Sequence, residues 1–546
     1  MRPTEGPSAT RRVRRSARRF AALAAVLALA SAALPPRLAH AQTPALPDGF
    51  RDSVMVRNLN EPVGLAFVPG GNRLLVVEQR TRFIRLVVNG VLSTTDPVGQ
   101  VDSVQTNGPE QGLLGIAVDP GFPARPYVYV HCDNLGNQTI RISRYTLAGD
   151  LDFTGNGALT LVAGSRRDIL RDLPDVASNH NGGTLRFGAD GYLYDSIGED
   201  ANPCAAQDTS GTSTATALRG KILRLDISNV PAGGGAPPAL STITPPTNPF
   251  VATNAPRSRL IWTYGLRNPF RFHVVPGTST LVIGDVGDGT WEEVDIVSSG
   301  GLNLGWPLRE GFANHAGSCS LLGAATAPVY VYNHSDGLAI VGGPSYHAAN
   351  GLPAGFPEAY EGDVFLSDYY TGFVRRLENV SGTWTATTAA GSPNGTDWAL
   401  GYENVSDWMV GPDGMLWYVR QFDSNFNDVS GSVGAIAGGG SAPPPPPPPA
   451  DTTDAFAIGK RYPVPSNGTF SVEGDVTGNV TLTVTVHALD GRLVRHVLGP
   501  RDFTSGPVTL TWDGLDDDGR KAPSGVYLFR IEGRGFDRTF RVPLVR

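Results

Sequence analysis

The sequence is poor in cysteine, has no surplus of basic residues and lacks a long apolar run. Only 3 cysteines occur among 546 residues, and none stands in the C-x-x-C spacing typical of zinc sites. Lys and Arg number 44 against 51 Asp and Glu, whereas nucleic-acid binding needs a basic surface. No stretch reaches the roughly 20 apolar residues of a transmembrane helix. These absences argue against a zinc-finger, nucleic-acid-binding or helical membrane protein.

Residues 1–41 carry the three parts of a secretory signal. An arginine-rich start precedes an apolar run over residues 20–34 and a small-x-small end at residues 39–41, which is the pattern of a signal peptide. We expect cleavage after Ala41 and an exported protein that is periplasmic, on the cell surface or secreted. The pair Arg18 and Arg19 leaves twin-arginine export open. Removal of this segment, with eight Arg and one Glu, changes the net charge from −7 to about −14.

The cysteine count of an exported chain leaves at least one thiol unpaired. Cys204 and Cys319 both stand in loop-like contexts with Asn, Pro, Gly and Ser neighbours. We therefore expect these two to pair if a disulfide forms, with Cys132 left over.

A linker divides the chain. Residues 437–450 combine three glycines with seven consecutive prolines, and such a run forms a stiff polyproline II spacer that cannot join a core. The sequence therefore predicts two folding units, residues 42–436 and residues 451–546.

The larger unit repeats an apolar strand, a turn of Pro, Gly, Asp or Asn, and a second apolar strand. Gly (67) and Pro (44) together make about a fifth of the chain, and both residues favour turns over long helices. Repeated units of two to four strands are typical of a β-propeller, here all-β with six blades. A large β-sandwich or two smaller β domains is the alternative. The copies span residues 64–77, 114–130, 184–194, 270–284, 362–366 and 408–419.

One histidine stands where packing does not account for it. His180 lies in Asn-His-Asn-Gly-Gly, directly before the third repeat, and Glu199 follows the end of that repeat. An imidazole in a polar loop is a candidate general base, and a nearby carboxylate would orient it.

A cationic block opens the fourth repeat. Arg267 and Asn268 stand between Gly265 and Pro269, which restrict the backbone, and they offer a guanidinium fork and an amide to an anionic or carbonyl-rich ligand. A structural tie between two blades is the alternative role for Arg267.

An acidic stretch follows. Five carboxylates, at positions 285, 288, 292, 293 and 295, lie within eleven residues among turn glycines. Carboxylate and carbonyl oxygens are the ligands that Ca²⁺ prefers, so this stretch predicts a calcium site. A solvated acidic turn is the alternative.

Taken in order, these blocks resemble the soluble pyrroloquinoline quinone (PQQ) dependent glucose/sorbosone and aldose sugar dehydrogenases, which are six-bladed propellers. The resemblance covers roughly residues 48–430. Its motifs are residues 112–115, 180–183, 187–194, 220–226, 248–250, 265–269, 284–287, 291–293 and 301–307.

The resemblance implies roles for individual residues. His180 would take the proton of the sugar's anomeric hydroxyl while hydride passes to the quinone, and Glu199 would orient it. Arg267 and Asn268 would hold the quinone oxygens and stabilise developing charge.

The same resemblance implies a cofactor Ca²⁺. The backbone carbonyls of Gly287 and Asp288 would be its ligands, and Glu292 and Glu293 are the neighbouring candidate metal residues. The ion would act as a Lewis acid on PQQ.

Two positions depart from the family pattern. In the family, an Arg-x-Arg-Asp element pairs with the PQQ carboxylates. The corresponding residues 404–407 of this chain are Asn-Val-Ser-Asp. Where an Arg or Lys usually follows a Gly-Gly-x-x-Tyr element, this chain has His347, which would take that cofactor-binding place.

Three functions therefore remain. The first is a PQQ- and Ca²⁺-dependent dehydrogenase that oxidises an aldose sugar to a lactone and passes electrons to an acceptor. The second is a non-enzymatic propeller that binds a glycan or protein partner, which the missing arginines favour. The third is a calcium-dependent, lactonase-like hydrolase, since propellers host several chemistries.

The last domain has the pattern of a small β-sandwich. Short alternating strands are predicted over residues 480–487, 508–512 and 525–531, with a turn at residues 516–519. It resembles the immunoglobulin-like domains of flagellar hook-capping proteins and of type IX secretion sorting tails. That resemblance implies an attachment or sorting module with a cell-surface or secretion partner.

Overall fold

The structure, a computed structural model, falls into two compact units that meet in sequence at Pro445 and Pro446. It describes residues 44–210, 218–348, 352–423, 426–438, 456–462, 468–476, 478–488, 492–523, 525–533 and 536–544. The expected signal segment, residues 1–41, and most of the expected linker lie outside these residues. Within them, no helix has the length and apolar character needed to cross a membrane.

The first three sheets of the larger unit are antiparallel and follow one another along the chain. Each sheet takes its strands in sequence order, with β6 and β11 as extra edge strands. Blade 1 contains β2 (Pro62–Val68), β3 (Arg73–Glu78), β4 (Phe83–Val88), β5 (Val91–Leu92) and β6 (Gly99–Gln100). Blade 2 contains β7 (Leu113–Val118), β8 (Tyr127–Asn134), β9 (Thr139–Gly149), β10 (Leu159–Leu161) and β11 (Arg167–Pro174). Blade 3 contains β12 (Leu185–Phe187), β13 (Leu193–Ile197), β14 (Lys221–Leu225) and β15 (Ile261–Tyr264).

The remaining three sheets continue the pattern, and the last is completed by the first strand of the chain. Blade 4 contains β16 (Arg271–Val274), β17 (Leu281–Asp285), β18 (Trp291–Val297) and β21 (Tyr330–Asn333). Blade 5 contains β22 (Ile340–Ser345), β23 (Val364–Asp368), β24 (Val374–Val380) and β25 (Thr383–Thr387). Blade 6 contains β26 (Val405–Val410), β27 (Leu416–Arg420), β28 (Gly431–Ala437) and β1 (Arg51–Leu59).

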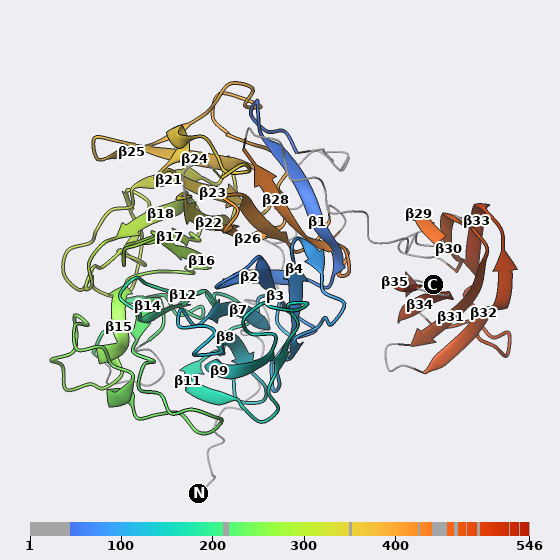
Figure 1. Cartoon of the computed structure of the whole chain (residues 1–546), viewed down its shortest axis with the longest axis horizontal. Coiled ribbons are helices and arrows are strands. Elements are labelled where there is room, and N and C mark those ends of the chain that lie inside the picture. Colours follow the sequence, from blue (N-terminus) through green and yellow to red (C-terminus); the bar gives the residue numbers. More distant parts are fainter. Residues whose placement is uncertain are drawn as a thin grey trace, which may run out of the picture. The chain divides into compact units, whose positions relative to one another are not determined.

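These sheets form a ring. The first strands β2, β7, β12, β16, β22 and β26 gather at its centre (Figure 1), and β1 closes it by pairing antiparallel with β28, so that Arg51 lies opposite Ala437. The six-bladed propeller predicted from the repeats is confirmed. We call the end of the ring at which every first strand begins and every second strand ends the entry end.

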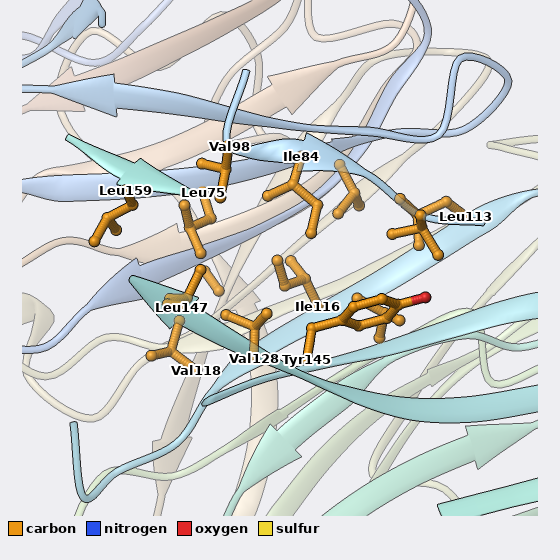
Figure 2. Close-up of a cluster of buried hydrophobic side chains, with 14 of the residues drawn as sticks. Leu75, Ile84, Val98, Leu113, Ile116, Val118, Val128, Tyr145, Leu147 and Leu159 are labelled. Atoms are coloured by element: carbon orange, nitrogen blue, oxygen red, sulfur yellow. The ribbon is translucent and has the colours of Figure 1, made fainter. Parts of the chain in front are cut away.

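The apolar core is divided among the blade interfaces. Leu75 and Ile84 of blade 1 pack against Ile116 and Val128 of blade 2 (Figure 2), and a comparable buried cluster fills each of the other five interfaces. Burial of apolar surface stabilises the fold by about 25 cal/mol per Å². Each blade therefore depends on both neighbours for its core.

A buried arginine fills the centre of the ring. Arg271, at the start of β16, donates to the carbonyl of Ser406 at 2.8 Å, the hydroxyl of Thr184 at 3.2 Å and the carbonyl of Leu114 at 3.2 Å. Asp407 lies beside it and accepts two bonds from Arg186. The partners of Arg271 come from several blades. This charged cluster therefore connects the inner strands of the ring.

Short elements complete the larger unit. The 3-10 turns are η2 (Pro203–Gln207), η3 (Leu240–Thr242), η4 (Ser258–Leu260) and η5 (Glu358–Tyr360), and a small hairpin contains β19 (Arg309–Glu310) and β20 (Ala313–Asn314). A disulfide joins Cys204 of η2 to Cys319, with the Cα atoms 5.7 Å apart. Cys132 is free and buried, so the expected pairing is confirmed.

The second unit is a β-sandwich. One sheet contains β29 (Phe456–Tyr462), β30 (Phe470–Val476) and β33 (Gly506–Trp512). The other contains, in spatial order, β32 (Leu493–Phe503), β31 (Val480–Ala488), β34 (Gly525–Gly533) and β35 (Phe536–Leu544). Buried side chains of both sheets, among them Trp512 and Phe529, form its core, which confirms the predicted sandwich.

Candidate functional site

His180 and Glu199 form a dyad at the entry end of blade 3. The imidazole Nδ1 lies 2.5 Å from Glu199 Oε1. The Glu199 side chain is 1% exposed, while the imidazole is 12% exposed. A carboxylate at Nδ1 selects the tautomer in which that nitrogen carries the proton. The Nε2 atom therefore keeps its lone pair and can accept a proton.

The backbone around His180 is held in an uncommon conformation. Its φ is 59°, in the left-handed region, and Gly182 follows with a φ of 69°. A Cβ on Gly198 would lie 2.0 Å from the carbonyl oxygen of His180. Only glycine therefore allows the end of β13 to approach the histidine loop, and this approach places Glu199 beside the imidazole.

Glu110 holds the histidine loop from blade 2. Its Oε2 accepts the backbone N–H of His180 at 2.8 Å and the side-chain amide of Asn268 at 3.3 Å. The Asn268 Oδ1 in turn accepts the N–H of Gly182 at 3.1 Å. Residues of three successive blades are therefore joined around the imidazole.

Asn181 anchors the same loop below the surface. Its side-chain amide donates to Asp175 Oδ1 at 2.6 Å and to Asp133 Oδ1 at 3.1 Å. Burial raises the pKa of both carboxyl groups, and the charge of Asp175 raises the pKa of Asp133 further. A carboxyl pair with raised pKa values shares a proton readily, so the two groups can lie close together without full repulsion.

Asp285 fixes the backbone of the cationic block. Its two carboxylate oxygens accept the N–H groups of Asn268, at 2.7 Å, and of Arg267, at 2.9 Å. Burial raises the pKa of Asp285 to about 7. The expected block of Arg267 and Asn268 thus lies beside the dyad, since Glu199 N–H also donates to the Arg267 carbonyl at 2.9 Å.

The guanidinium of Arg267 points across blade 4. It donates to the carbonyl of Val286 at 3.1 Å and lies 3.2 Å from Asp288, and it stands 5.6 Å from the ring centre of Trp306. Its buried Nε and the buried Oε2 of Glu199 have no partner among the described residues. The site therefore contains at least one unused donor and one unused acceptor among its described residues.

The acidic stretch is organised by a residue outside it. Glu310 Oε1 accepts four successive backbone N–H groups, from Asp288 to Trp291, at 2.8 to 3.2 Å. Burial alone would raise the pKa of Glu310, but these amides outweigh it and lower the pKa. In the loop that was expected to bind calcium, these four backbone N–H groups are thus satisfied by a protein carboxylate, that of Glu310.

Glu292 and Glu293 are not brought together. They are neighbours on β18 and so face opposite sides of the sheet. Glu292 is bound to His334 Nε2 at 2.9 Å and to the N–H of Ile340 at 3.0 Å, while Glu293 accepts the N–H of Gly311 at 2.5 Å. Among the described residues no group of three or more His, Cys, Asp or Glu side chains forms a metal site. The backbone carbonyls of Gly287 and Asp288 remain the candidate ligands.

His347 lies at the opposite end of blade 5, which corrects its expected cofactor-binding place. In β22, Ile340 pairs with Asp368 at the entry end, while Ser345 pairs with Val364 at the far end. His347 follows Ser345 and bonds to Glu361 at 2.5 Å. The backbone direction of β22 therefore separates it from His180 by the height of the ring.

Neutral side chains, several of them aromatic or amide groups, occupy part of the entry end of blades 5 and 6. Asn404 N–H donates to the Tyr369 carbonyl at 2.7 Å, and the Tyr369 hydroxyl donates to Gln421 Oε1 at 2.8 Å. The Gln421 amide reaches Gln79 of blade 1 at 2.5 Å. Ser406 is fully buried behind them. The positions where family arginines were expected thus hold neutral side chains.

Sequence reasoning missed Glu110, Asp285 as an anchor, and Tyr370. Glu110 belongs to no motif and reaches His180 only through folding. Tyr370 is 54% exposed although it is a large aromatic residue. The tyrosine pair at positions 369 and 370, directly after β23, was the available signal for an aromatic loop.

Two family models match the chain. Residues 59–424 match the glucose/sorbosone dehydrogenase model, and residues 461–535 match the FlgD Ig-like domain. The first match covers more than half of the chain and all of the site residues described above.

Relatives of the chain include enzymes and proteins named otherwise. The aldose sugar dehydrogenase YliI of Escherichia coli is 26% identical, with 50% of this chain and 66% of that protein covered. The quinoprotein glucose dehydrogenase B of Acinetobacter calcoaceticus is 28% identical over 50% of this chain and 55% of its own length. The HIPL2 protein of Arabidopsis thaliana is 31% identical, with 42% of this chain and 34% of that protein covered. The matches thus span between a third and two thirds of these relatives.

Solved structures share the propeller. A glucose dehydrogenase-like putative oxidoreductase of Thermus thermophilus is 27% identical with a TM-score of 0.52, covering 71% of this chain and 100% of its own. The PQQ-bound aldose sugar dehydrogenase of Streptomyces coelicolor is 24% identical with a TM-score of 0.51, covering 72% of this chain and 99% of its own. At that identity the second likeness concerns the fold alone.

Proposed function

Because the chain belongs to the glucose/sorbosone dehydrogenase family, we propose that it oxidises an aldose sugar at the anomeric carbon, with PQQ and Ca²⁺, to a lactone. The observation that carries this proposal is the His180–Glu199 dyad beside Arg267. The names of two relatives, an aldose sugar dehydrogenase and a quinoprotein glucose dehydrogenase, support the substrate class and the cofactor.

The dyad supplies the base. Oxidation of an anomeric carbon removes a hydride from carbon and a proton from its hydroxyl. His180 Nε2 would take that proton, and Glu199 would stabilise the resulting imidazolium through Nδ1. A positioned general base contributes about 10²- to 10⁴-fold to the rate.

The cationic block supplies charge stabilisation. Arg267 is held by Asp285 through its backbone N–H and by the Val286 carbonyl through its guanidinium, so the guanidinium is oriented before any ligand arrives. A preorganised donor stabilises negative charge without reorganisation during the reaction. The terminal nitrogens of this guanidinium and the amide of Asn268 would hold the oxygens of a carbonyl-rich ligand.

The residues present fit the reactive end of PQQ better than its carboxylates. When bound, this cofactor supplies a quinone that accepts the hydride. Arg267 and Asn268 would hold its quinone oxygens. The carboxylates would meet the exposed Tyr370, with no cation at the buried positions Asn404 and Ser406, which removes charge-assisted contacts of about 1.5–3 kcal/mol each.

Calcium would bind through backbone oxygens. The carbonyls of Gly287 and Asp288 are the ligands we propose, with the rest of the shell from solvent or ligand. Glu310 supports this arrangement, since it fixes the conformation of the same loop from its N–H side.

A second function is favoured by one observation. The neutral side chains at positions 404 and 406, where the family pattern has arginines, suit a propeller that binds a glycan or protein without oxidising it. Under this alternative the His180 dyad would contribute hydrogen bonds only.

The ends of the chain suggest where it acts. We propose export directed by residues 1–41 and attachment or sorting through the Ig-like domain. The disulfide between Cys204 and Cys319 supports an oxidising compartment. The electron acceptor would then be outside the cytoplasm.

A titration tests the proposal. Purified protein would be titrated with PQQ at saturating Ca²⁺, followed by cofactor absorbance, and an aldose and a redox dye would then be added. Saturable binding with sugar-dependent dye reduction is expected. Absence of binding at high micromolar PQQ would reject the dehydrogenase and leave the binding function.

A further inference from the structure

A serine, a histidine and a glutamate are hydrogen-bonded in series at the far end of blade 5. Ser345 Oγ lies 3.1 Å from His347 Nε2, and His347 Nδ1 lies 2.5 Å from Glu361 Oε1. A nucleophile, a base and a carboxylate that orients the base, linked in this order at such distances, form the triad of serine hydrolases. The three residues lie at the end of the ring opposite to His180, so the cluster is separate from the site described above.

The backbone holds the three side chains in place. Tyr346, between the serine and the histidine, donates its N–H to the Asp363 carbonyl at 2.7 Å and accepts the Gly362 N–H at 2.8 Å. Its buried ring is anchored as well, since its hydroxyl donates to the carbonyl of Gly414 at 2.8 Å. Glu361 directly precedes Gly362, so these bonds fix the glutamate opposite the segment that carries the other two residues.

The glutamate sets the role of each ring nitrogen. A carboxylate at Nδ1 of His347 selects the tautomer in which that nitrogen carries the proton. The lone pair of Nε2 then faces Ser345 and can take the proton of its hydroxyl. The same hydroxyl also donates to the carbonyl of Gly362 at 3.2 Å, which keeps its oxygen beside the imidazole. This arrangement activates a serine as a nucleophile.

The cluster is open to solvent on the side of the histidine. The imidazole is 30% exposed and the Glu361 side chain 42% exposed, whereas Ser345 is 4% exposed. A Cβ placed on Gly362 would have no atom within 4 Å, so the turn beside the triad is uncovered. A ligand therefore approaches along the imidazole, and only a small group reaches the serine oxygen.

The charges around the triad favour a neutral ligand. Glu358 and Glu361 are both exposed carboxylates. The guanidinium of Arg376 is engaged, because it is ion-paired with Asp363 and donates to the carbonyl of Ala359 at 2.9 Å. A negatively charged ligand would therefore be repelled by two carboxylates, and a neutral one would not.

We propose that Ser345, His347 and Glu361 form a hydrolytic site for neutral carboxylic esters with a short acyl chain. Ser345 Oγ attacks the ester carbonyl carbon while His347 Nε2 takes the hydroxyl proton, and the alcohol leaves with that proton as its bond to the acyl carbon breaks. Water then attacks the acyl-serine in the same way, which releases the acid and restores the serine hydroxyl. Glu361 is the positioning residue. The reaction consumes only water, so it goes beyond the proposed sugar oxidation and does not depend on it.

Labelling of the full chain with a fluorophosphonate tests the nucleophile. This probe forms a phosphonyl ester with an activated serine and releases fluoride. Peptide mass spectrometry should find the adduct on Ser345 in the folded protein and not in heat-unfolded protein. His347→Asn should lower the labelling rate about tenfold or more, with thermal unfolding as a folding control. Absence of an adduct on Ser345 in the folded protein would overturn the proposal.

Ester hydrolysis tests the activity and the substrate class. Ser345→Ala should lower kcat/KM for p-nitrophenyl acetate about tenfold or more, and the parent protein should hydrolyse p-nitrophenyl octanoate about tenfold more slowly than the acetate. Exposed imidazoles also attack p-nitrophenyl acetate. His496→Asn is therefore the matched control, because His496 is 61% exposed and paired with Asp517 at 2.7 Å in the second unit. Equal hydrolysis by Ser345→Ala and the parent would overturn the proposal, and equal rates with both esters would reject the short acyl chain.

The role of the glutamate has its own readout. Glu361→Gln should lower kcat for p-nitrophenyl acetate about tenfold while KM stays within about twofold, since the carboxylate acts through the imidazole and does not contact the ester. Glu361→Asp, which keeps the charge, should recover part of the loss. An unchanged kcat in Glu361→Gln would contradict the positioning role.

Discussion

The two halves of the entry end differ in chemistry although they belong to one ring of similar blades. On blades 3 and 4, ionisable groups are held in place by protein partners: the dyad, Arg267 and Asp285. On blades 5 and 6, the corresponding loops carry Tyr370 and Asn404, and the polar groups satisfy one another. Because the scaffold is the same, the difference lies in the loops, which is where propellers vary their function. We propose that the first half moves protons and stabilises charge, whereas the second offers neutral and aromatic side chains.

The largest effect should come from removing the proposed base, His180, on blade 3. His180→Asn is the suitable variant, because Asn tolerates the left-handed φ of 59°. We expect sugar-dependent dye reduction to fall about 10²- to 10⁴-fold, which is the contribution of a positioned general base. Steady-state kinetics measure it, with thermal unfolding as a folding control. Retained turnover would show that another residue is the base.

The second effect concerns stability and pH. Asp285 has a pKa of about 7 in the folded protein against an ordinary value of 3.8. Between pH 4 and 7 the folded state therefore holds a proton that the unfolded state has lost. The contribution of Asp285 to the free energy of unfolding falls over this range as pH rises, by about 4 kcal/mol at most. Between these pH values the free energy of unfolding of Asp285→Asn should fall less than that of the parent protein. Urea unfolding at pH 4.5 and 8 measures the difference. Parallel pH profiles of variant and parent would contradict the assignment.

A third change would make the neutral half resemble the charged half. Tyr370→Arg places a guanidinium on an exposed turn, where it can pair with a PQQ carboxylate. One charge-assisted contact of about 1.5–3 kcal/mol should raise PQQ affinity about 10- to 100-fold. Absorbance titration measures it, and Val380→Arg adds the same charge away from the site. An equal gain in both variants would indicate a non-specific charge effect.

The smallest effect should follow Asp288→Asn. The Asp288 side chain is 51% exposed and its ion pair with Arg267 is 3.2 Å long, so its loss should change the free energy of unfolding by about 0–1 kcal/mol. Calcium binding, followed by calorimetry, should persist because the backbone carbonyl remains. Loss of calcium binding in this variant would assign the ligand to the carboxylate instead.

Much of this arrangement was predictable from local sequence. The repeats predicted the blades because each carries its own strand and turn signals, and the pair of Cys204 and Cys319 followed from their loop contexts. The proximity of His180 and Glu199 followed from their places before and after one hairpin. These inferences needed only short-range geometry.

The rest depended on direction and on long-range contacts. His347 was expected at the cofactor, but the direction of β22 puts it at the other end of the ring. Glu292 and Glu293 lie on opposite faces of β18. A count of carboxylates in the sequence does not show on which face each one lies. Glu110 reaches His180 from another blade, and no spacing in the sequence marks that contact.

The pairing of β1 with β28 has a consequence for synthesis. Arg51 leaves the ribosome near the beginning of the described chain, yet its partner Ala437 follows only after five complete blades and most of the sixth. Strand β1 must therefore wait unpaired while the other blades form, and contacts so distant in sequence slow folding. A nascent or truncated chain that ends before β28 therefore leaves β1 without its partner strand and leaves β27 as an open edge of the last blade.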